Sequence, residues 1–350
     1  MIEVLIVEDS RVVSEYLYYI LSKDPEIQVI GNVSNGKKAI EFVKEHKPDV
    51  ITMDVDMPIM DGLEATGIIM STTPVPIIMV TASRNAKESR IAMEALAAGA
   101  LSVIEKPAGI GHPDEEKQQK ELLKMVKLIS EIKVITRRPH LYKKPDSITQ
   151  FKKAEVSFDD FYRKKIVAVG ISSGGPVVLQ KIFSKITKQF PLPILVVQHI
   201  TSGFLDGLVN WLNDTLRIPI HAAVDNETVL PGHIYFAPDG HEMAVDKTGK
   251  IILTRCRLNN GICPSVAHLF NSIANEYVNN SITMILTGMG SDGAKELKLL
   301  RDAGSITIAQ DKESSMVHGM PGVAINLDAA DYILNPEEIA EILYKIEINK

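Results

Sequence analysis

The chain has 350 residues, 45% of them hydrophobic and 23% charged, with a formal net charge of −6. This composition excludes a mainly disordered or fibrous protein, and the length suggests about two domains. No apolar run approaches the ~20 residues of a membrane helix, no signal peptide is recognisable, and acidic chains repel nucleic acid, so we expect a cytoplasmic protein without membrane insertion.

The first ~130 residues alternate short apolar runs with amphipathic segments, the pattern of strands and helices. The predicted strands are 4–7, 29–33, 50–53, 77–80 and 102–104. Among the predicted helices, 10–22 begins behind Asp9 or Ser10 as a cap, 86–98 stops at Gly99, and 114–133 closes the unit. This order indicates a parallel sheet with helices on both faces.

A basic segment separates the two halves of the chain. Residues 134–165 hold nine Lys or Arg against four Asp or Glu, and Pro139 and Pro145 interrupt any regular period. We interpret residues 134–164 as a solvated linker, with a short ordered piece at 158–162.

From Lys165 the alternation of strands and helices resumes. The predicted strands are 166–169, 194–197, 283–286 and 305–309, and the predicted helices are 176–185, 204–215, 265–278 and 293–303. Residues 234–237, 243–245 and 251–254 are predicted to form an antiparallel insert with a turn at 247–249. A last helix is predicted from Pro336, with Asn335 as its cap.

Charged and polar residues follow the predicted strands of the first half. They are Glu8, Asp9, Asp54, Asp56, Thr81 and Lys106. Ligands bind at the carboxyl ends of parallel strands, and converging carboxylates favour a hard divalent cation such as Mg²⁺. An aspartate beside that cation can accept a phosphoryl group, which Thr81 and Lys106 would contact. A single acid such as Asp9 is more simply read as a helix cap, but the whole set is not.

This first half resembles a response-regulator receiver domain, in segments 8–10 (EDS), 53–62 (MDVDMPIMDG), 80–82 (VTA) and 105–107 (EKP). The resemblance implies that Asp54 is the phosphoacceptor and that Mg²⁺ is bound by Glu8, Asp9, the Asp54 side chain and the Asp56 backbone carbonyl. It assigns phosphoryl signalling to Thr81 and Lys106. One departure is Val103, at a position where receivers usually carry an aromatic residue.

A second group of residues suggests nucleophilic chemistry. The predicted strand 166–169 leads into Gly-Ile-Ser-Ser-Gly, a G-x-S-x-G turn that exposes Ser172, although a glycine-rich phosphate-binding loop is an equal interpretation. His199 ends the next predicted strand and is the best-placed base among nine histidines. Asp292 follows another strand and suits an orienting acid, although a lone Asp there is more often a helix cap. The order Ser, His, Asp differs from that of α/β-hydrolases.

The second half resembles the catalytic domain of the chemotaxis protein-glutamate methylesterases, from about residue 166 to 344. Further carrying segments are 197–199 (VQH), 264–266 (PSV), 286–290 (LTGMG) and 319–321 (GMP). The resemblance implies Ser172 as nucleophile, His199 as general base and acid, Asp292 as orienting acid and the Met289 backbone N–H in the oxyanion hole. Cys263 and Ala267 depart from the family pattern. With only two cysteines, we expect neither a disulfide framework nor a four-ligand zinc site, and interpret Cys263 as a small structural residue.

Together these observations predict an α/β protein with two doubly wound parallel-sheet domains, the second Rossmann-like with an antiparallel insert and the first flavodoxin-like. We expect a receiver at 1–133, the linker at 134–164 and a methylesterase domain at 165–350. The resemblance implies a phosphorylation-activated serine esterase that acts on glutamate methyl esters, and on glutamines by deamidation, of methyl-accepting chemotaxis receptors. A sensor histidine kinase would be the phosphodonor, and no cofactor is expected in the esterase site.

The regulatory hypothesis is that the unphosphorylated receiver covers the Ser172 site until Asp54 is phosphorylated. Two other functions remain open at this point, the same chemistry on another ester and a non-enzymatic receptor-binding adaptor. A DNA-binding regulator is not favoured, because no basic helix-turn-helix pattern follows the linker.

Overall fold

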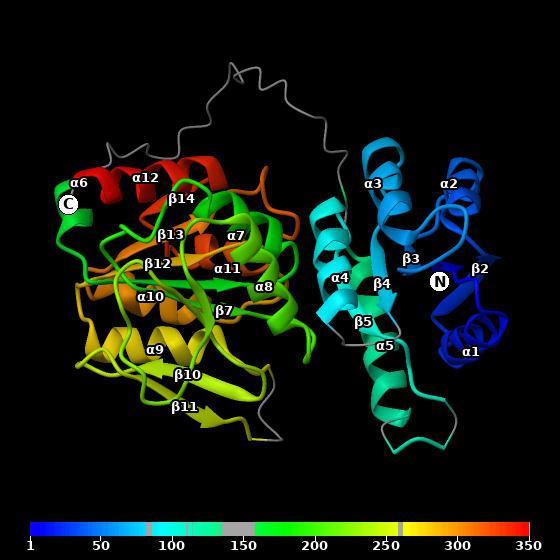
Figure 1. Cartoon of the computed structure of the whole chain (residues 1–350), viewed down its shortest axis with the longest axis horizontal. Helices are drawn as coiled ribbons and strands as arrows, with labels where there is room; N and C mark the ends of the chain where they lie inside the picture. Colours follow the sequence, from blue (N-terminus) through cyan, green and yellow to red (C-terminus); the bar gives the residue numbers. More distant parts are fainter. Residues whose placement is uncertain are drawn as a thin grey trace. The chain divides into compact units, whose positions relative to one another are not determined.

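The computed structural model describes residues 1–81, 86–109, 111–113, 115–132, 134, 158–257 and 262–349. The chain divides into two compact units, Met1–Lys144 and Pro145–Lys350 (Figure 1). Most of the predicted linker 134–164 lies outside the described residues. No helix in the described ranges is long and apolar enough to cross a bilayer.

Unit 1 is a five-stranded parallel sheet in the order β2-β1-β3-β4-β5. Its strands are β1 (Ile2–Val7), β2 (Ile27–Val33), β3 (Val50–Asp54), β4 (Ile77–Thr81) and β5 (Ser102–Glu105). Its helices are α1 (Arg11–Leu21), α2 (Gly36–Glu45), α3 (Gly62–Thr72), α4 (Ala86–Ala98) and α5 (Glu115–Ser130). Helix α1 packs with α5, whereas α2, α3 and α4 pack in series, so helices flank the sheet on both faces. The doubly wound prediction for this half is confirmed.

The choice between Asp9 and Ser10 as the N-cap of α1 decides whether the Asp9 carboxylate is available for another role. Ser10 is the N-cap, and its hydroxyl accepts a hydrogen bond from the Val13 backbone N–H. Asp9 is therefore not needed as a cap, and its exposed carboxylate remains at the carboxyl edge of the sheet.

Unit 2 is built on a seven-stranded parallel sheet in the order β14-β13-β12-β6-β7-β9-β8. Its strands are β6 (Ile166–Ile171), β7 (Ile194–Gln198), β8 (Ile220–Ala222), β9 (Ile234–Phe236), β12 (Ser281–Ile285), β13 (Ile306–Gln310) and β14 (Tyr332–Leu334). Its helices are α6 (Phe158–Tyr162), α7 (Gly175–Phe183), α8 (Leu205–Thr215), α9 (Val266–Glu276), α10 (Ala294–Asp302), α11 (Met320–Asn326) and α12 (Pro336–Asn349). The predicted second α/β domain is confirmed.

The antiparallel insert is smaller than predicted. Only β10 (His241–Val245) and β11 (Ile251–Arg255) pair antiparallel, whereas β9 joins the main sheet parallel to β7 and β8. All three residues of β9 are buried, which suits a strand with neighbours on both sides better than a surface hairpin. Strands β8 and β14 were not predicted, since each has three residues and lies at one edge of the sheet.

The last residues of the predicted linker fold onto unit 2. Phe161 in α6 is fully buried and its ring lies 5.9 Å from that of Tyr332. Lys164 is also buried, and its ammonium group donates to the Asn279 backbone carbonyl at 2.8 Å. Burial lowers the pKa of Lys164. Residues 158–164 are therefore a structured start of unit 2 and not solvated chain.

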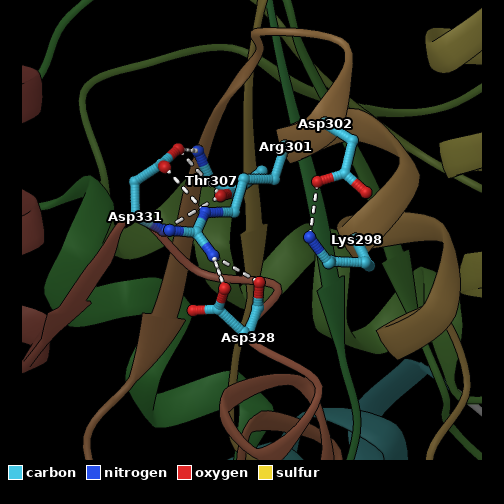
Figure 2. A network of polar contacts seen from close by, with 6 residues as sticks. All are labelled: Lys298, Arg301, Asp302, Thr307, Asp328 and Asp331. Atoms are coloured by element: carbon cyan, nitrogen blue, oxygen red, sulfur yellow. Dashed lines mark hydrogen bonds and ion pairs between the residues drawn. The ribbon is translucent and has the colours of Figure 1, made fainter.

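A polar network fixes the far end of α10 (Figure 2). The guanidinium of Arg301 pairs with Asp331 at 2.9 Å and with Asp328 at 2.6 Å. Asp331 in turn accepts hydrogen bonds from the backbone N–H and the hydroxyl of Thr307 in β13. These contacts tie the C-terminal end of α10 to the sheet, while its N-terminal end follows Asp292 directly.

Candidate active site and receiver pocket

The register of two central strands of unit 2 brings Ser172 and His199 together. Ile171 at the end of β6 pairs with Gln198 at the end of β7, so the residues that follow them, Ser172 and His199, leave the sheet side by side. The His199 backbone N–H donates to the Ile171 carbonyl at 2.9 Å, which extends the pairing by one residue. The structure thus confirms both strand-end positions.

The turn after β6 is shaped by small residues. Gly174 has φ +80°, and a Cβ there would lie 2.7 Å from the Met316 side chain. Gly288 packs against the turn from the next strand, because a Cβ at Gly288 would lie only 2.5 Å from Cβ of Ser172. No side chain larger than hydrogen fits between Gly288 and Ser172 without moving the serine.

Gln198 links the serine turn to the histidine. Its side-chain amide donates to the backbone carbonyl of Ser172 at 2.9 Å and to that of His199 at 2.8 Å. The side chain is buried, so both hydrogen bonds are sheltered from water. Gln198 therefore fixes the spacing of the two residues, a role that sequence reasoning missed because its segment had been noticed only as part of a family resemblance.

His199 and Asp292 are in direct contact. Nε2 of His199 lies 3.0 Å from Oδ2 of Asp292. A carboxylate only accepts hydrogen bonds, so in the neutral ring this contact places the proton on Nε2 and leaves the lone pair on Nδ1. Nδ1 is then the nitrogen available as a base.

Asp292 lies against the N-terminus of α9. Its two oxygens accept hydrogen bonds from the Ser265 hydroxyl at 3.0 Å and from the backbone N–H groups of Val266 at 2.7 Å and Ala267 at 3.1 Å. Burial tends to raise the pKa of Asp292, but the hydrogen bond from His199 and those from α9 outweigh it, and the pKa is lowered. Asp292 is held as an anion and is not a simple cap of α10. Ser265 was also missed as a site residue, although Pro-Ser-Val before a helical pattern is an N-cap signal.

Met289 follows Gly288 on the loop that packs against Ser172. Gly288 is anchored on both sides, since its N–H donates to the Val317 carbonyl and its own carbonyl accepts from Gly319 and Met320. Among the described residues, no group accepts a hydrogen bond from the Met289 N–H. The role predicted for this N–H as a donor to the oxyanion stays a prediction.

Cys263 was predicted to be a small structural residue, and the structure pairs it with the other cysteine of the chain. Cys256, just after β11, and Cys263, just before Pro264, form a disulfide with Cα atoms 6.2 Å apart. Two cysteines are too few for a disulfide framework, but a single disulfide requires only that the two segments carrying them meet.

In unit 1 the carboxyl ends of β1, β3 and β5 meet around Lys106. Its ammonium group lies 2.9 Å from Oε2 of Glu8 and 2.9 Å from Oδ2 of Asp54. Both carboxylates are nearly inaccessible, and burial raises the pKa of each, although Lys106 opposes the shift. Burial tends to lower the pKa of Lys106, but its two acidic partners outweigh it and the pKa is raised. The anions are thus incompletely balanced by one lysine.

The other residues predicted for this pocket do not all contribute a side chain to the acidic cluster. Carboxylate oxygens of Glu8, Asp9 and Asp54 lie within 4.8 Å of one another, a donor set of the kind that Mg²⁺ prefers. Asp56 contributes no side chain to this cluster, and the role predicted for its backbone carbonyl stays a prediction. Thr81 is buried at the end of β4, and its carbonyl accepts from the Lys106 N–H at 2.7 Å. Val103 is buried within β5.

Comparisons with known proteins identify relatives of both units. Residues 4–112 match the family model of the response regulator receiver domain, and residues 167–343 match that of the CheB methylesterase. A protein-glutamate methylesterase/protein-glutamine glutaminase of Nitrosospira multiformis is 46% identical over 98% of this chain and 96% of its own length. A relative of the same description from Syntrophus aciditrophicus is 47% identical over 99% of this chain and 98% of its own.

Among solved structures, the Thermotoga maritima CheB methylesterase catalytic domain aligns with a TM-score of 0.50 and 37% identity, covering 52% of this chain and 98% of that one. With a family match over half of the chain and relatives aligned over nearly all of it, the chain belongs to the CheB family of chemotaxis protein-glutamate methylesterases/protein-glutamine glutaminases that carry a receiver domain.

Proposed function

We propose that this chain hydrolyses glutamate γ-methyl esters, and deamidates glutamines, on the cytoplasmic helices of methyl-accepting chemotaxis receptors. The single observation that carries the proposal is the contact series at one sheet edge. Ser172 and His199 leave paired strands, and Nε2 of His199 lies 3.0 Å from an Asp292 carboxylate that α9 holds as an anion.

In the proposed reaction, Ser172 is the nucleophile and Nδ1 of His199 takes its hydroxyl proton as Oγ attacks the ester carbonyl. The Met289 N–H donates to the oxygen that becomes negative. Asp292 stabilises the imidazolium through Nε2 without itself taking the proton. The imidazolium then protonates the leaving methanol, or ammonia from a glutamine, and a water molecule repeats the sequence to release the acid.

The proposed control lies in unit 1, with Asp54 as acceptor of a phosphoryl group from a sensor histidine kinase. Glu8, Asp9 and Asp54 would hold Mg²⁺, with the Asp56 carbonyl as a further ligand, and Mg²⁺ when bound neutralises charge on the phosphoryl oxygens. Lys106 pairs with Asp54 already and would follow its new phosphoryl oxygens, with Thr81 as a second donor. We propose a receiver at 1–133 that raises the rate of a catalytic domain at 165–350 when phosphorylated, in a cytoplasmic protein.

The test is methanol release from methylated receptor, with and without a small phosphodonor and Mg²⁺. Wild type should release methanol faster with the phosphodonor, and Ser172→Ala should lower the rate by about 10³-fold or more. Ser173→Ala is the matched control, because the neighbouring serine has no assigned role in proton transfer. No methanol from wild type would exclude this substrate, and equal rates in wild type and Ser172→Ala would leave only an adaptor role.

A further inference from the structure

The disulfide of unit 2 lies beside the proposed catalytic carboxylate. The Cys256 backbone N–H donates to the Gly240 carbonyl at 2.9 Å, which fixes this cysteine at the end of β11. Cys263 stands two residues before Ser265, the N-cap of α9. Their Cα separation of 6.2 Å falls in the usual range for disulfides. Both cysteines are half-buried.

The segment that starts at Cys263 carries most of the hydrogen bonds to Asp292. Three of the four groups that contact this carboxylate, the Ser265 hydroxyl and the next two backbone N–H groups, follow Cys263 within four residues. Ser265 also contacts the β10–β11 hairpin, because its backbone N–H donates to the Glu242 carboxylate in β10 at 2.8 Å. The disulfide and Glu242 therefore fix the start of α9 to the β10–β11 hairpin.

We propose that Cys256 and Cys263 form a reversible thiol–disulfide site, and that its oxidation state changes the esterase rate through the position of Asp292. The effect on rate rests on the proposed function, whereas formation of the disulfide does not. The oxidised form, in which α9 is tied to β11, is the faster one. Reduction removes that tie and leaves the Glu242 hydrogen bond to hold the start of α9.

The oxidant is a small-molecule disulfide, RSSR. The thiolate of one cysteine attacks a sulfur of RSSR, forming a mixed disulfide and releasing one RSH after proton uptake. The thiolate of the second cysteine then attacks the protein sulfur of the mixed disulfide and displaces the second RS⁻, which takes up a proton. In total one S–S bond is broken, one is formed, and the two protons of the cysteine thiols leave with two RSH. The carboxylate of Glu242 lies within 4.8 Å of both sulfur atoms and disfavours the thiolate, so we expect the exchange to be faster at higher pH.

The same three side chains also resemble an incomplete metal site. Ligand atoms of Glu242, Cys256 and Cys263 lie within 4.8 Å of one another, and reduced thiols bind Zn²⁺. One oxygen of Glu242 is already used by the Ser265 N–H, which leaves a weaker set than the four ligands of structural zinc sites. We therefore favour thiol–disulfide exchange and treat zinc retention as a contrary outcome.

The experiment uses the full chain with glutathione disulfide as the RSSR probe, dithiothreitol as reductant and EDTA throughout. The chain has only two cysteines, so the loss of both free thiols, with no added glutathione mass, identifies the internal disulfide. Methanol release is then measured in both states for wild type, Cys256→Ser and Cys263→Ser. Cys256→Ser is the sharper variant, because it breaks the bond and leaves the residue before Pro264 unchanged.

We expect oxidised wild type to have a kcat about five-fold above the reduced form, with KM unchanged and full reversal by dithiothreitol. Both serine variants should match reduced wild type and ignore the oxidant. The proposal is overturned if each cysteine keeps a glutathione, if reduced wild type retains zinc against EDTA, or if the disulfide forms while kcat stays the same. A change in KM alone would overturn the link to Asp292. Absence of methanol in every state would contradict the proposed function and leave the thiol result standing.

Discussion

Asp54 is the last residue of β3, whereas Asp292 lies in the loop between β12 and α10. Both carboxylates lie on the side of a parallel sheet where the strands end, yet their surroundings differ. Asp54 lies among other acids, and burial raises its pKa. Asp292 receives hydrogen bonds from His199, Ser265 and two backbone N–H groups, and its pKa is lowered. Asp54 shares its lysine, Lys106, with Glu8, whereas Asp292 receives a full set of hydrogen-bond donors.

This difference separates a carboxylate that needs a ligand from one that is already satisfied. Around Asp54, Lys106 pairs with two of three clustered carboxylates, so a bound cation would relieve the repulsion that remains among them. Around Asp292 the donors belong to the fold itself, so the anion is ready to orient a histidine without any cofactor. The opposite pKa shifts of the two carboxylates thus agree with the separate roles proposed for them.

The largest expected effect comes from removing the charge of Asp292. Asp292→Asn should lower kcat by about 10⁴-fold, because it no longer stabilises the imidazolium or holds its tautomer. The new NH₂ group also faces donors of α9, which should cost about 1–3 kcal/mol of stability. Methanol release and thermal unfolding measure both effects.

Asp302→Asn is the matched control for that substitution. Asp302 ends the same helix that follows Asp292, is well exposed and pairs only with Lys298 within the described residues. An exposed pair contributes at most about 0.5 kcal/mol, so activity and stability should stay close to wild type. If kcat fell by less than about ten-fold in Asp292→Asn, the catalytic role proposed for the charge of Asp292 would be contradicted.

Substitution of two glycines tests the difference between the Asp54 and Ser172 surroundings through steric clashes. A Cβ at Gly288 would lie 2.5 Å from Cβ of Ser172, and one at Gly62 would lie 1.9 Å from the Asp54 carbonyl oxygen. Gly288→Ala should lower kcat about 10²-fold by displacing the nucleophile. Gly62→Ala should destabilise unit 1 by about 1–3 kcal/mol and abolish the response to phosphodonor, with the unstimulated esterase kept. Each variant is the control for the other. A loss of unstimulated esterase activity in Gly62→Ala would contradict the separate roles proposed for unit 1 in regulation and unit 2 in catalysis.

Asp54→Asn tests whether the acidic cluster needs a cation. We expect Mg²⁺ affinity to fall at least about ten-fold and stimulation by phosphodonor to disappear, because a ligand and the acceptor are lost together. Mg²⁺-dependent thermal shifts and methanol release measure the two effects. Asp49→Asn is the control, since Asp49 is exposed and precedes β3, at the opposite end of the strand from Asp54. Equal Mg²⁺ shifts in both variants would remove Asp54 from the cation site.

The smallest effect is an opposite pH dependence of the two units without Mg²⁺. The pKa of Asp54 is raised, so its contribution to stability is present below its ordinary value of 3.8 and is lost as pH rises through the folded value. The pKa of Asp292 is lowered, so its contribution is present above 3.8 and is lost as pH falls through the folded value.

Denaturant unfolding of the full chain can separate these two slopes. The single tryptophan, Trp211 in α8, reports on unit 2 by fluorescence, whereas circular dichroism reports on both units. Asp54→Asn should flatten the decline of unit 1 towards higher pH, and Asp292→Asn should flatten the loss of unit 2 towards lower pH. If the unfolding free energies of both units changed with pH in the same direction, the opposite pKa shifts of Asp54 and Asp292 would be contradicted.

Local sequence signals were sufficient for much of the fold. The buried strands of both sheets are apolar runs, and Ser10, Gly99 and Asn335 mark helix ends through their own backbone or side-chain chemistry. Strand β9 was misplaced because three apolar residues look the same in a hairpin and in a parallel sheet. Strand β9 lies between β7 and β8 in the main sheet, and local periodicity does not reveal which separate segments pair with each other.

The candidate site divides in the same way. Local patterns were enough to predict that Ser172, His199 and Asp54 stand where strands end and that Asp292 follows a strand, because hydrophobic period and turn chemistry are local properties. The contact of His199 Nε2 with Asp292, the donors from α9 and the pairing of Cys256 with Cys263 are visible in the folded chain alone. Those contacts join segments far apart in the chain, and their geometry follows from strand order and helix packing, which no local pattern encodes.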